Sequence, residues 1–391
     1  MSKIANMINE LCPNGVEFKR LGDVCEVLRG KRLTKAQLSD DGKYPVLHGG
    51  LTPMGYYHEY NRKANTTIVV NTGNAGCVLY FDKEFWSSDA CFSVYPKDCL
   101  LDRFLYFCLK VREDEIKGNI RIGAMPTIDS NAVANLEIPV PPLAVQSKIV
   151  EILDNFTELE AELEAELEAR KKQYEYYRNK LLTFNEIGGG IEQVKWLKMS
   201  EFGTFFRGKS LQKKDFAEYG IPCIHYGQLY THYGTFAYTT KSFVSEDFGK
   251  GKDNAQTGDV VIATTSENVE DVAKCVAWLG DDNIMVSNDA CYFRHNQNPK
   301  YIAYSLQTLR FLDFKKQNVT GTKVIRISPD KMGNYEIPLP SLERQQEIVD
   351  VLDAFESLTT SLQSGLPAEI ALRRQQYEYY RNKLLTFKRA S

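Results

Sequence analysis

The 391-residue chain lacks the patterns that mark several common classes of protein. Its nine cysteines are an odd number and include no CxxC pair, so we expect no disulfide framework and a reducing compartment. Its five histidines are scattered, without HExxH or Cys/His ligand spacing, so we expect no structural metal. No apolar signal segment follows Met1, and the longest uncharged stretch, 65–81, is rich in Asn, Thr and Gly. These absences predict a cytoplasmic protein that is neither secreted nor membrane-spanning.

What the sequence does contain is an internal repeat. QYEYYRNKLLTF occurs at 173–184 and again, letter for letter, at 376–387. Upstream of each copy lies a second matched pair, LEIPVPPLAVQSKIVEILDNF at 136–156 and YEIPLPSLERQQEIVDVLDAF at 335–355. A repeat this long is not a solenoid and indicates two homologous units of domain size.

Weaker echoes lie upstream of the matched segments. They are Arg29-Gly30-Lys31 against Arg207-Gly208-Lys209, Pro45 and His48 against Pro222 and His225, and Ser88-Asp89-Ala90-Cys91-Phe92 against Asn288-Asp289-Ala290-Cys291-Tyr292. We interpret the last pair as core, because a small apolar strand is usually preserved for packing. Each half is thus a diverged region followed by a nearly fixed segment, which suggests two different targets and one shared kind of partner.

The fixed segments predict long helices. In both, a proline-rich lead (IPVPP or IPLPS) precedes apolar residues at coiled-coil spacing, as in Ile149, Leu153 and Phe156. We expect one helix over 143–184 and a second with a kink or break at 365–367. Gly188-Gly189-Gly190 is expected to mark the exit from the first helix. A long helix packed only on its own domain is the alternative to antiparallel pairing of the two.

The diverged regions predict α+β domains. Short β-rich runs (TTIVV, GCVLYF, DVVIATT, KCVAWL) accompany one amphipathic helix each, over 101–117 and 300–316. The predicted fold class is therefore α+β: two homologous α/β domains separated by two long antiparallel coiled-coil helices, with a pseudo-twofold internal repeat. The predicted boundaries are 1–135 for the first domain, 136–185 for the central helix, 186–334 for the second domain and 335–391 for the distal helix.

No motif in the chain predicts catalysis well. Residues 203–210 match the phosphate-loop pattern GxxxxGK[ST], but Phe205, Phe206 and Arg207 are poorly suited to wrapping phosphates. The equivalent segment of the first half keeps only Arg-Gly-Lys. A nuclease motif beginning at Pro329-Asp330 meets proline where its lysine should be, and neither a GxSxG elbow nor an amino-methyltransferase motif is present. We interpret the chain as a non-catalytic binding and scaffolding protein.

Charge and loop composition allow nucleic-acid binding. The net charge is −3, but eight acids lie within 151–168, so the rest of the chain is net positive. Both diverged regions carry Arg, Lys, Asn, Thr and His of the kinds that contact phosphates and base edges. The candidate DNA-binding residues are Arg29, Lys31, Arg32, His48, Asn71, Thr72, Asn74 and Arg121 in the first half, and Arg207, Lys209, His225, Tyr226, Thr264, Thr265, Ser266, Asn268, Lys323 and Arg326 in the second.

The duplicated IP(V/L)P…Q…IV…LD.F helices ending in QYEYYRNKLLTF resemble the specificity subunit of a type I restriction-modification system, along the whole chain. The resemblance implies two variable target-recognition domains, each reading one half of a split sequence in double-stranded DNA. It implies that the conserved helices set the gap and bind two modification (methyltransferase) subunits, with restriction (translocase/endonuclease) subunits in the larger complex. S-adenosylmethionine, ATP and Mg would then be held by those partners, and this chain would hold no cofactor.

The repeated motif also suggests a partner surface, because aromatic and Arg side chains are typical interface anchors. The candidate partner-binding residues are Tyr174, Tyr177, Arg178, Tyr377, Tyr380 and Arg381. Three tandem Glu-Leu-Glu-Ala copies at 158–169 stand where the family often carries repeats that tune spacer length. They are also explained by a solvated acidic face with a leucine packing stripe. Two other functions stay open: a P-loop ATPase with a coiled-coil arm, and a stand-alone DNA-binding protein.

Overall fold

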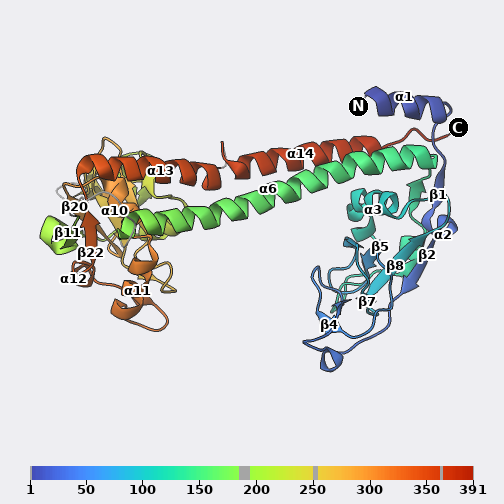
Figure 1. The fold of residues 1–391 in the computed structure, drawn as a ribbon, viewed down its shortest axis with the longest axis horizontal. Coiled ribbons are helices and arrows are strands. Elements are labelled where there is room, and N and C mark those ends of the chain that lie inside the picture. Colours follow the sequence, from blue (N-terminus) through green and yellow to red (C-terminus); the bar gives the residue numbers. More distant parts are fainter. Residues whose placement is uncertain (1, 185–193, 250–253, 362–363, 391) are drawn as a thin grey trace. The chain divides into compact units, whose positions relative to one another are not determined.

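The computed structural model describes residues 2–184, 194–249, 254–361 and 364–390. The chain forms two compact units, one made of Met1–Glu164 with Glu369–Ser391 and the other of Ala165–Ala368 (Figure 1). Each unit therefore contains its own diverged region and one QYEYYRNKLLTF copy from the other half of the sequence. The glycines at 188–190, predicted to mark a helix exit, lie outside the described residues. No helix in the described part of the chain is long and apolar enough to cross a membrane.

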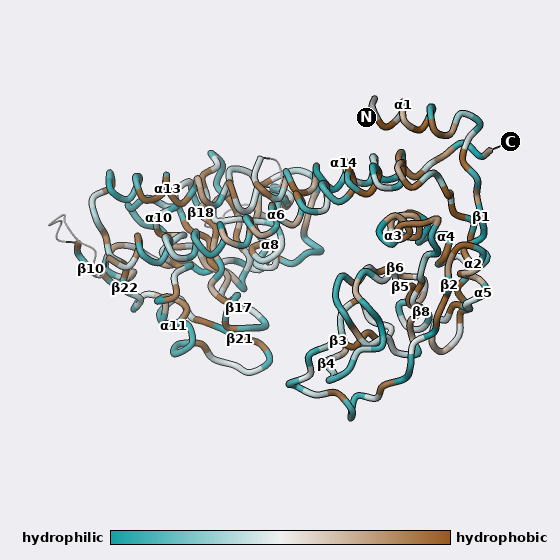
Figure 2. The backbone as a smooth tube through the Cα atoms, turned by 45° about the vertical axis from the view of Figure 1, so that its right-hand side comes forward, coloured by the Kyte–Doolittle hydropathy of each residue, from teal (hydrophilic) through white to brown (hydrophobic). Residues whose placement is uncertain are grey.

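The first unit has a sheet covered by a helix. The strands β2 (Cys25–Arg29), β8 (Cys91–Pro96), β5 (Thr66–Val70) and β6 (Val78–Phe81) form an antiparallel sheet in that order. The helix α3 (Asp102–Val111) contacts β5, β6 and β8 and buries Phe104, Leu105 and Cys108. Figure 2 shows hydrophobic residues gathered along β2, α2 (Leu21–Val24) and α3.

Smaller elements complete this unit. A second sheet has the order β4-β3-β7, and a two-stranded sheet pairs β1 with β9. The bounds are α1 Ser2–Leu11, β1 Phe18–Arg20, the 3-10 turn η1 Lys35–Gln37, β3 Tyr44–Leu47, β4 Gly55–Tyr57, β7 Trp86–Ser87, α4 Glu113–Lys117, α5 Ser130–Ala134 and β9 Glu137–Pro139. Near the end of the chain, the backbone of Ala390 and Lys388 hydrogen-bonds to Val16, which ties the last residues to the first.

The second unit repeats this architecture. The strands β11 (Gly203–Arg207), β20 (Ala290–His295), β16 (Val260–Ala263) and β18 (Cys275–Trp278) follow the same order as β2-β8-β5-β6, with β14 (Phe236–Ala237) added at the edge. A mixed sheet, β12-β15-β13-β19, contains the counterpart of β4-β3-β7, because β13 pairs parallel with β19 as β3 does with β7. The predicted α+β class and internal repeat are therefore confirmed.

The remaining bounds of the second unit are β10 Lys195–Lys198, α7 Met199–Phe202, the 3-10 turn η2 Lys213–Asp215, β12 Phe216–Ala217, β13 Ile221–Ile224, α8 Tyr226–Thr231, β15 Ser242–Val244, α9 Glu246–Gly249, β17 Thr265–Ser266, β19 Met285–Val286, α10 Pro299–Ser305, α11 Leu309–Asn318, β21 Ile325–Arg326, α12 Pro329–Met332 and β22 Glu336–Leu339. Two further two-stranded sheets pair β10 with β22 and β17 with β21.

The prediction of a single amphipathic helix in each diverged region was wrong, because two helices form in each range. Residues 101–117 form α3 and α4, interrupted at Arg112, and three acids in the first turn of α4 favour a new helix start there. Residues 300–316 fall in α10 and α11, and Thr308 caps α11 by accepting a hydrogen bond from the Phe311 amide at 3.3 Å. The restart leaves Leu309, at the start of α11, 63% exposed.

The fixed segments form the predicted helices. α6 runs from Leu143 to Thr183, whereas the second fixed segment is divided into α13 (Leu342–Thr360) and α14 (Leu366–Leu385). The break predicted at 365–367 is confirmed, since proline is accepted only in the first turn of a helix. Within the first unit α6 and α14 are antiparallel: Phe156 stacks on Tyr380, and farther along α6 Glu160 and Glu164 both pair with Arg374.

A buried glutamine joins each diverged region to its helix. The Gln146 side chain, on α6, donates to the carbonyls of Cys99 and Pro141 at 2.8 Å and accepts from the Leu101 amide at 2.9 Å. Its counterpart Gln345, on α13, donates to the Pro340 carbonyl and accepts from the Asn298 amide, both at 3.0 Å. Each glutamine thus links a proline lead to the residues that precede α3 or α10.

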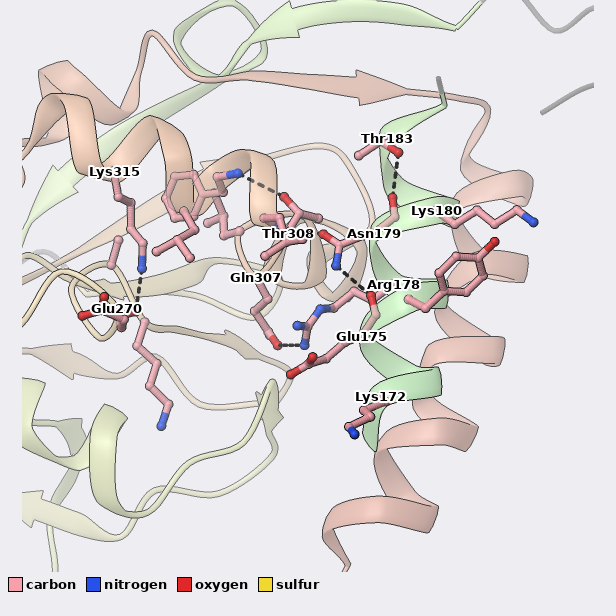
Figure 3. A pocket seen from close by; sticks show the side chains of 17 residues that line it. Lys172, Glu175, Arg178, Asn179, Lys180, Thr183, Glu270, Gln307, Thr308 and Lys315 are labelled. Carbon is pink, nitrogen blue, oxygen red and sulfur yellow. Dashed lines mark hydrogen bonds between the residues drawn. The ribbon is translucent and has the colours of Figure 1, made fainter. Parts of the chain in front are cut away.

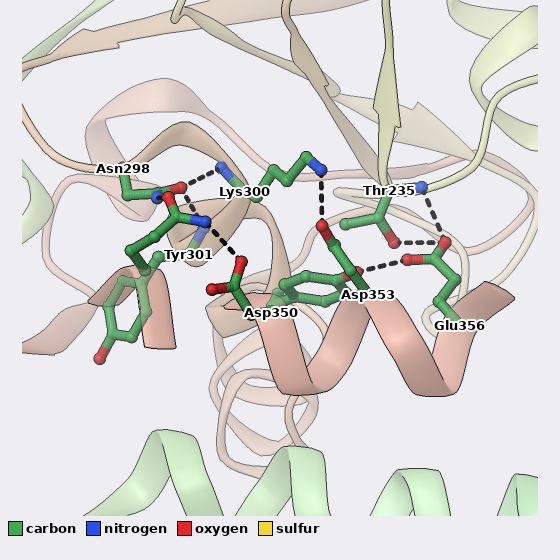
Figure 4. A network of polar contacts seen from close by, with 9 residues as sticks. Thr235, Asn298, Lys300, Tyr301, Asp350, Asp353 and Glu356 are labelled. Atoms are coloured by element: carbon green, nitrogen blue, oxygen red, sulfur yellow. Dashed lines mark hydrogen bonds and ion pairs between the residues drawn. The ribbon is translucent and has the colours of Figure 1, made fainter. Parts of the chain in front are cut away.

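Charged side chains reinforce both joints. Arg103 of α3 pairs with Asp154 of α6 at 2.7 Å, and Lys300 of α10 pairs with Asp353 of α13 at 2.6 Å. Around Asp353 a wider network forms (Figure 4). The Tyr304 hydroxyl lies 2.7 Å from the Asp353 carboxylate and 2.6 Å from that of Glu356. Glu356 also accepts hydrogen bonds from the amide and hydroxyl of Thr235.

We predict that Gln146→Leu destabilises the first unit by roughly 2–4 kcal/mol, because it leaves a buried amide and two carbonyls without partners. Urea unfolding gives the free energy, and hydrogen exchange at the Leu101 amide locates the change. Ser147→Ala, at the exposed neighbouring position, is the control. Unchanged protection of Leu101 in the glutamine variant would contradict the prediction.

Because His295, at the end of β20, is largely buried, we expect the free energy of unfolding to depend on pH. Burial lowers the pKa of His295 to about 4, with Asp259 opposing the shift, and its Nδ1 accepts from the Gln297 amide at 3.1 Å. Between about pH 6.5 and pH 4 the unfolded chain therefore binds a proton that the folded chain does not, so stability falls as the pH falls. We predict that His295→Gln removes about 2 kcal/mol of this loss. Urea unfolding of both proteins at pH 7 and pH 4.5 measures it; identical pH dependence would refute the assignment.

Candidate nucleic-acid interface

The Arg-Gly-Lys echo lies at equivalent places in the two units. Arg29 ends β2 and Arg207 ends β11, and the chain then passes close to another backbone segment. A Cβ on Gly30 would lie 2.1 Å from the Ser88 carbonyl oxygen, and one on Gly208 would lie 1.9 Å from that of Ser287. Glycine is therefore required for close approach. Residues 203–207 form a strand paired along β20, so the phosphate-loop match does not form a phosphate-binding loop.

Two adjoining hollows lie beside this turn in the first unit. Their volumes are about 370 and 500 Å³, and Arg29 and Thr72 line both. The predicted residues that line one or the other are Arg29, Arg32, His48, Asn71, Thr72 and Arg121. The structure thus brings six of the eight predicted side chains together from four separate segments of the chain.

Several of these side chains hold the loop around Asp89 in place. Arg29 Nε and Asn71 Nδ2 donate to the Asp89 carbonyl at 2.9 and 3.0 Å, and His48 Nδ1 lies 2.6 Å from Ser88 Oγ. Asn71 is buried, so it supports the hollow from beneath. Arg32 and Arg121 are exposed, and the Arg121 guanidinium lies 3.5 Å from the Asp129 carboxylate at the edge of the hollow.

The second unit has one hollow of about 490 Å³ at the equivalent place. Four predicted residues line it, namely Arg207, Thr264, Thr265 and Arg326. Asp289, the counterpart of Asp89, accepts from Thr265 Oγ1 at 3.3 Å, and its carbonyl accepts from the Thr264 amide at 2.9 Å. Both units therefore place an arginine, an aspartate and hydroxyl or amide side chains around a hollow.

The other predicted residues lie outside the hollows. They are Lys31 and Asn74 in the first unit, and Lys209, His225, Tyr226, Ser266, Asn268 and Lys323 in the second. Some have structural contacts: Asn74 donates to the Gly49 carbonyl, and Asn268 donates to Asp271. His225 caps α8, with Nδ1 accepting from the Gly227 amide, and burial together with Lys213 lowers its pKa, which favours the neutral ring.

Sequence reasoning missed part of the lining. Asp89 and Asp289 belong to the echo that was interpreted as core; Ser88 and Cys91 are buried as predicted, but the two aspartates are half-buried and face the hollows. Their repetition in both halves was the available signal. No sequence signal pointed to Thr127 and Thr320, because only the fold brings these residues to the rim of the hollows.

The repeated motif presents two faces. Tyr177 stacks on Phe355 at 5.6 Å and Tyr380 on Phe156 at 5.5 Å, while Tyr174 is buried and Tyr377 packs against the core of the first unit. Arg178 and Arg381 lie over Tyr174 and Tyr377. Four predicted partner-binding tyrosines thus pack within the chain.

The outer face carries aromatics that were not predicted. Tyr176 is 58% exposed and Tyr379, its counterpart, is 59% exposed. Lys180 lies 5.5 Å from the Tyr176 ring and Lys383 lies 5.6 Å from the Tyr379 ring. The same Tyr-Lys pair is therefore offered to solvent twice.

In the second unit this face borders a cavity of about 780 Å³ (Figure 3). Residues 172–183 of α6 line one side, and the segment joining α10 to α11 lines the other. Asn179 accepts from the Leu309 amide at 2.7 Å, which fixes α11 to α6. Lys315 donates to the carbonyls of Glu270 and Val272, and burial lowers its pKa to about 8. Five cationic and two acidic side chains give the lining a positive balance.

The duplicated hollows and helices define a two-domain recognition protein. The chain belongs to the family described as the type I restriction modification DNA specificity domain, whose model matches residues 13–169 and 191–372. The resemblance inferred from the repeated helices is therefore confirmed, and neither the P-loop ATPase nor the stand-alone protein is favoured.

Relatives match nearly the whole chain. The type I restriction enzyme EcoR124I/EcoR124II specificity subunit of Escherichia coli is 29% identical, over 95% of this chain and 94% of its own length. The type I restriction enzyme MjaVIII specificity subunit of Methanocaldococcus jannaschii is 24% identical, over 88% of this chain and 87% of its own length.

Solved structures share the fold. The S subunit of a type I system from M. genitalium has a TM-score of 0.59 at 18% identity, covering 95% of this chain and 96% of its own. A chain from a study of complex assembly and conformational transition of a type I system has a TM-score of 0.61 at 16% identity. The match covers 95% of this chain and 97% of that one.

Proposed function

We propose that this chain is the DNA-recognition subunit of a type I restriction-modification complex, acting in the cytoplasm, and that each unit reads one half of a split DNA target. The observation that carries the proposal is that hollows lie at equivalent places in the two diverged domains. Arginines at the rim can contact phosphates or guanine, and the side chains that differ between the hollows can distinguish bases.

The repeated helices are the proposed docking sites for two modification subunits. The same exposed pair of a tyrosine and a lysine occurs twice, as Tyr176 with Lys180 and as Tyr379 with Lys383. Two copies of one partner would need such a repeated surface. Tyrosine is enriched at the centres of protein interfaces, and lysine beside it favours an acidic partner surface. S-adenosylmethionine would be held by these modification subunits and ATP by the restriction subunits that complete the complex, with Mg also held in the partner subunits.

We predict that exchanging residues 1–135 for the corresponding domain of another family member changes one half of the methylated sequence only. The second domain is untouched, and the helices that carry the docking faces are retained. Sequencing of methylated bases in cells with the modification subunit reads the result. A change in both halves, or in neither, would refute the division of labour.

We predict that Tyr176→Ala with Tyr379→Ala leaves a folded chain that no longer assembles with two modification subunits. Both rings are largely exposed, so the stability of the chain should change by about 0.5 kcal/mol or less. Light scattering measures the mass of the complex, and each single variant should retain one partner.

The matched control is Tyr177→Ala with Tyr380→Ala. These rings stack inside the units, so their loss should lower the melting temperature. Full assembly by the Tyr176/Tyr379 double variant would refute the docking face.

A further inference from the structure

Each unit carries one more repeated feature, a short hairpin at the rim of its hollow. In the first unit the amides of Arg121 and Thr127 each donate to the other residue's carbonyl, at 2.8 and 3.2 Å. In the second unit Thr320 and Arg326 do the same, both at 2.9 Å. The loop length is identical, and the arginine and threonine have exchanged ends.

Both hairpins are fixed to the same part of the scaffold. Thr127 bridges to Thr72, two residues after the end of β5, and Arg326 pairs with Thr265, two residues after the end of β16. The hairpin residues Arg121 and Thr127 line one hollow, Met125 lines its neighbour, and Thr320 and Arg326 line the hollow of the second unit. The closing residues are therefore held by backbone hydrogen bonds at the edge of each candidate site.

The tips differ in chemistry. The first tip is IGAMP, residues 122–126, which has no charge and holds Ile122 at 96% and Met125 at 63% exposed. Ile122 is the most exposed large hydrophobic residue in the described part of the chain. The second tip is GTKVI, residues 321–325, with an exposed Lys323 followed by the exposed Arg326.

We infer that these hairpins are the base-reading elements of the two domains, an inference that rests on the proposed function. The occupant is double-stranded DNA, because Met125 of the apolar first tip shares its hollow with Arg29 and Arg32, and Arg121, which closes the hairpin, lines the adjoining hollow. In the major groove, apolar side chains contact the thymine methyl group, and Lys and Arg bind the O6 and N7 of guanine. Ile122 and Met125 therefore read thymine in the first half-site, and Lys323 and Arg326 read guanine in the second.

The test uses the complex with modification subunits and duplexes carrying its methylated target, as found by sequencing. Replacing thymine by uracil in the first half-site removes only the methyl group, and should weaken binding about fourfold. The variant Ile122→Ala with Met125→Ala should be insensitive to this replacement. Replacing guanine by 7-deazaguanine in the second half-site should weaken binding by the native chain but not by Lys323→Met with Arg326→Met.

Leu11→Ala, an exposed leucine on α1, is the control and should respond to both base analogues as the native chain does. Melting temperatures verify that the variants fold. Equal sensitivity of the native chain and the hairpin variants, or a first half-site without thymine, overturns the inference while leaving the proposed function intact. Binding without any sequence preference overturns both.

Discussion

The arrangement of each unit depends on one buried glutamine. Gln146 and Gln345 satisfy the carbonyl of a proline lead and the amide that precedes the domain helix, so neither segment can move without leaving a buried group unpaired. An unpaired buried group costs about 1–3 kcal/mol. The neighbouring ion pairs Arg103–Asp154 and Lys300–Asp353 also hold the domain helices, α3 and α10, against α6 and α13. Each hollow is thereby held in a fixed relation to the helix of its own unit.

The composition of the units explains why the repeated motif is identical in both halves. The inner face of each copy stacks on the fixed segment of the other half, Tyr177 on Phe355 and Tyr380 on Phe156, so both copies meet matched helices there while the outer face meets solvent. Tyr177 and Tyr380 serve the inner face, and Tyr176 and Tyr379 the outer one. A substitution on either face would act on packing or on the proposed partner contact, so both constraints apply within the same twelve residues.

The sequence predicted what periodicity and repetition encode, namely the class of fold, the duplicated units, the long helices and the break at 365–367. It did not predict features set by tertiary contacts. The QYEYY pattern places three tyrosines within four residues, and spacing alone does not show that Tyr176 is the exposed one. Asp89 lies in an apolar echo and was assigned to the core for that reason. The hollows join segments distant in sequence, and in the second unit six of the ten predicted residues lie outside them.

The hairpins show how two domains can share a scaffold and still differ in the side chains that they expose. Their closing contacts are backbone hydrogen bonds, which are indifferent to side-chain identity, so arginine and threonine can exchange ends between Arg121/Thr127 and Thr320/Arg326 without changing the register. Substitutions at exposed tip residues usually alter stability by no more than about 0.5 kcal/mol. Recognition can therefore diverge at the tips at little cost to folding, while the glutamine joints and the helix faces stay constant.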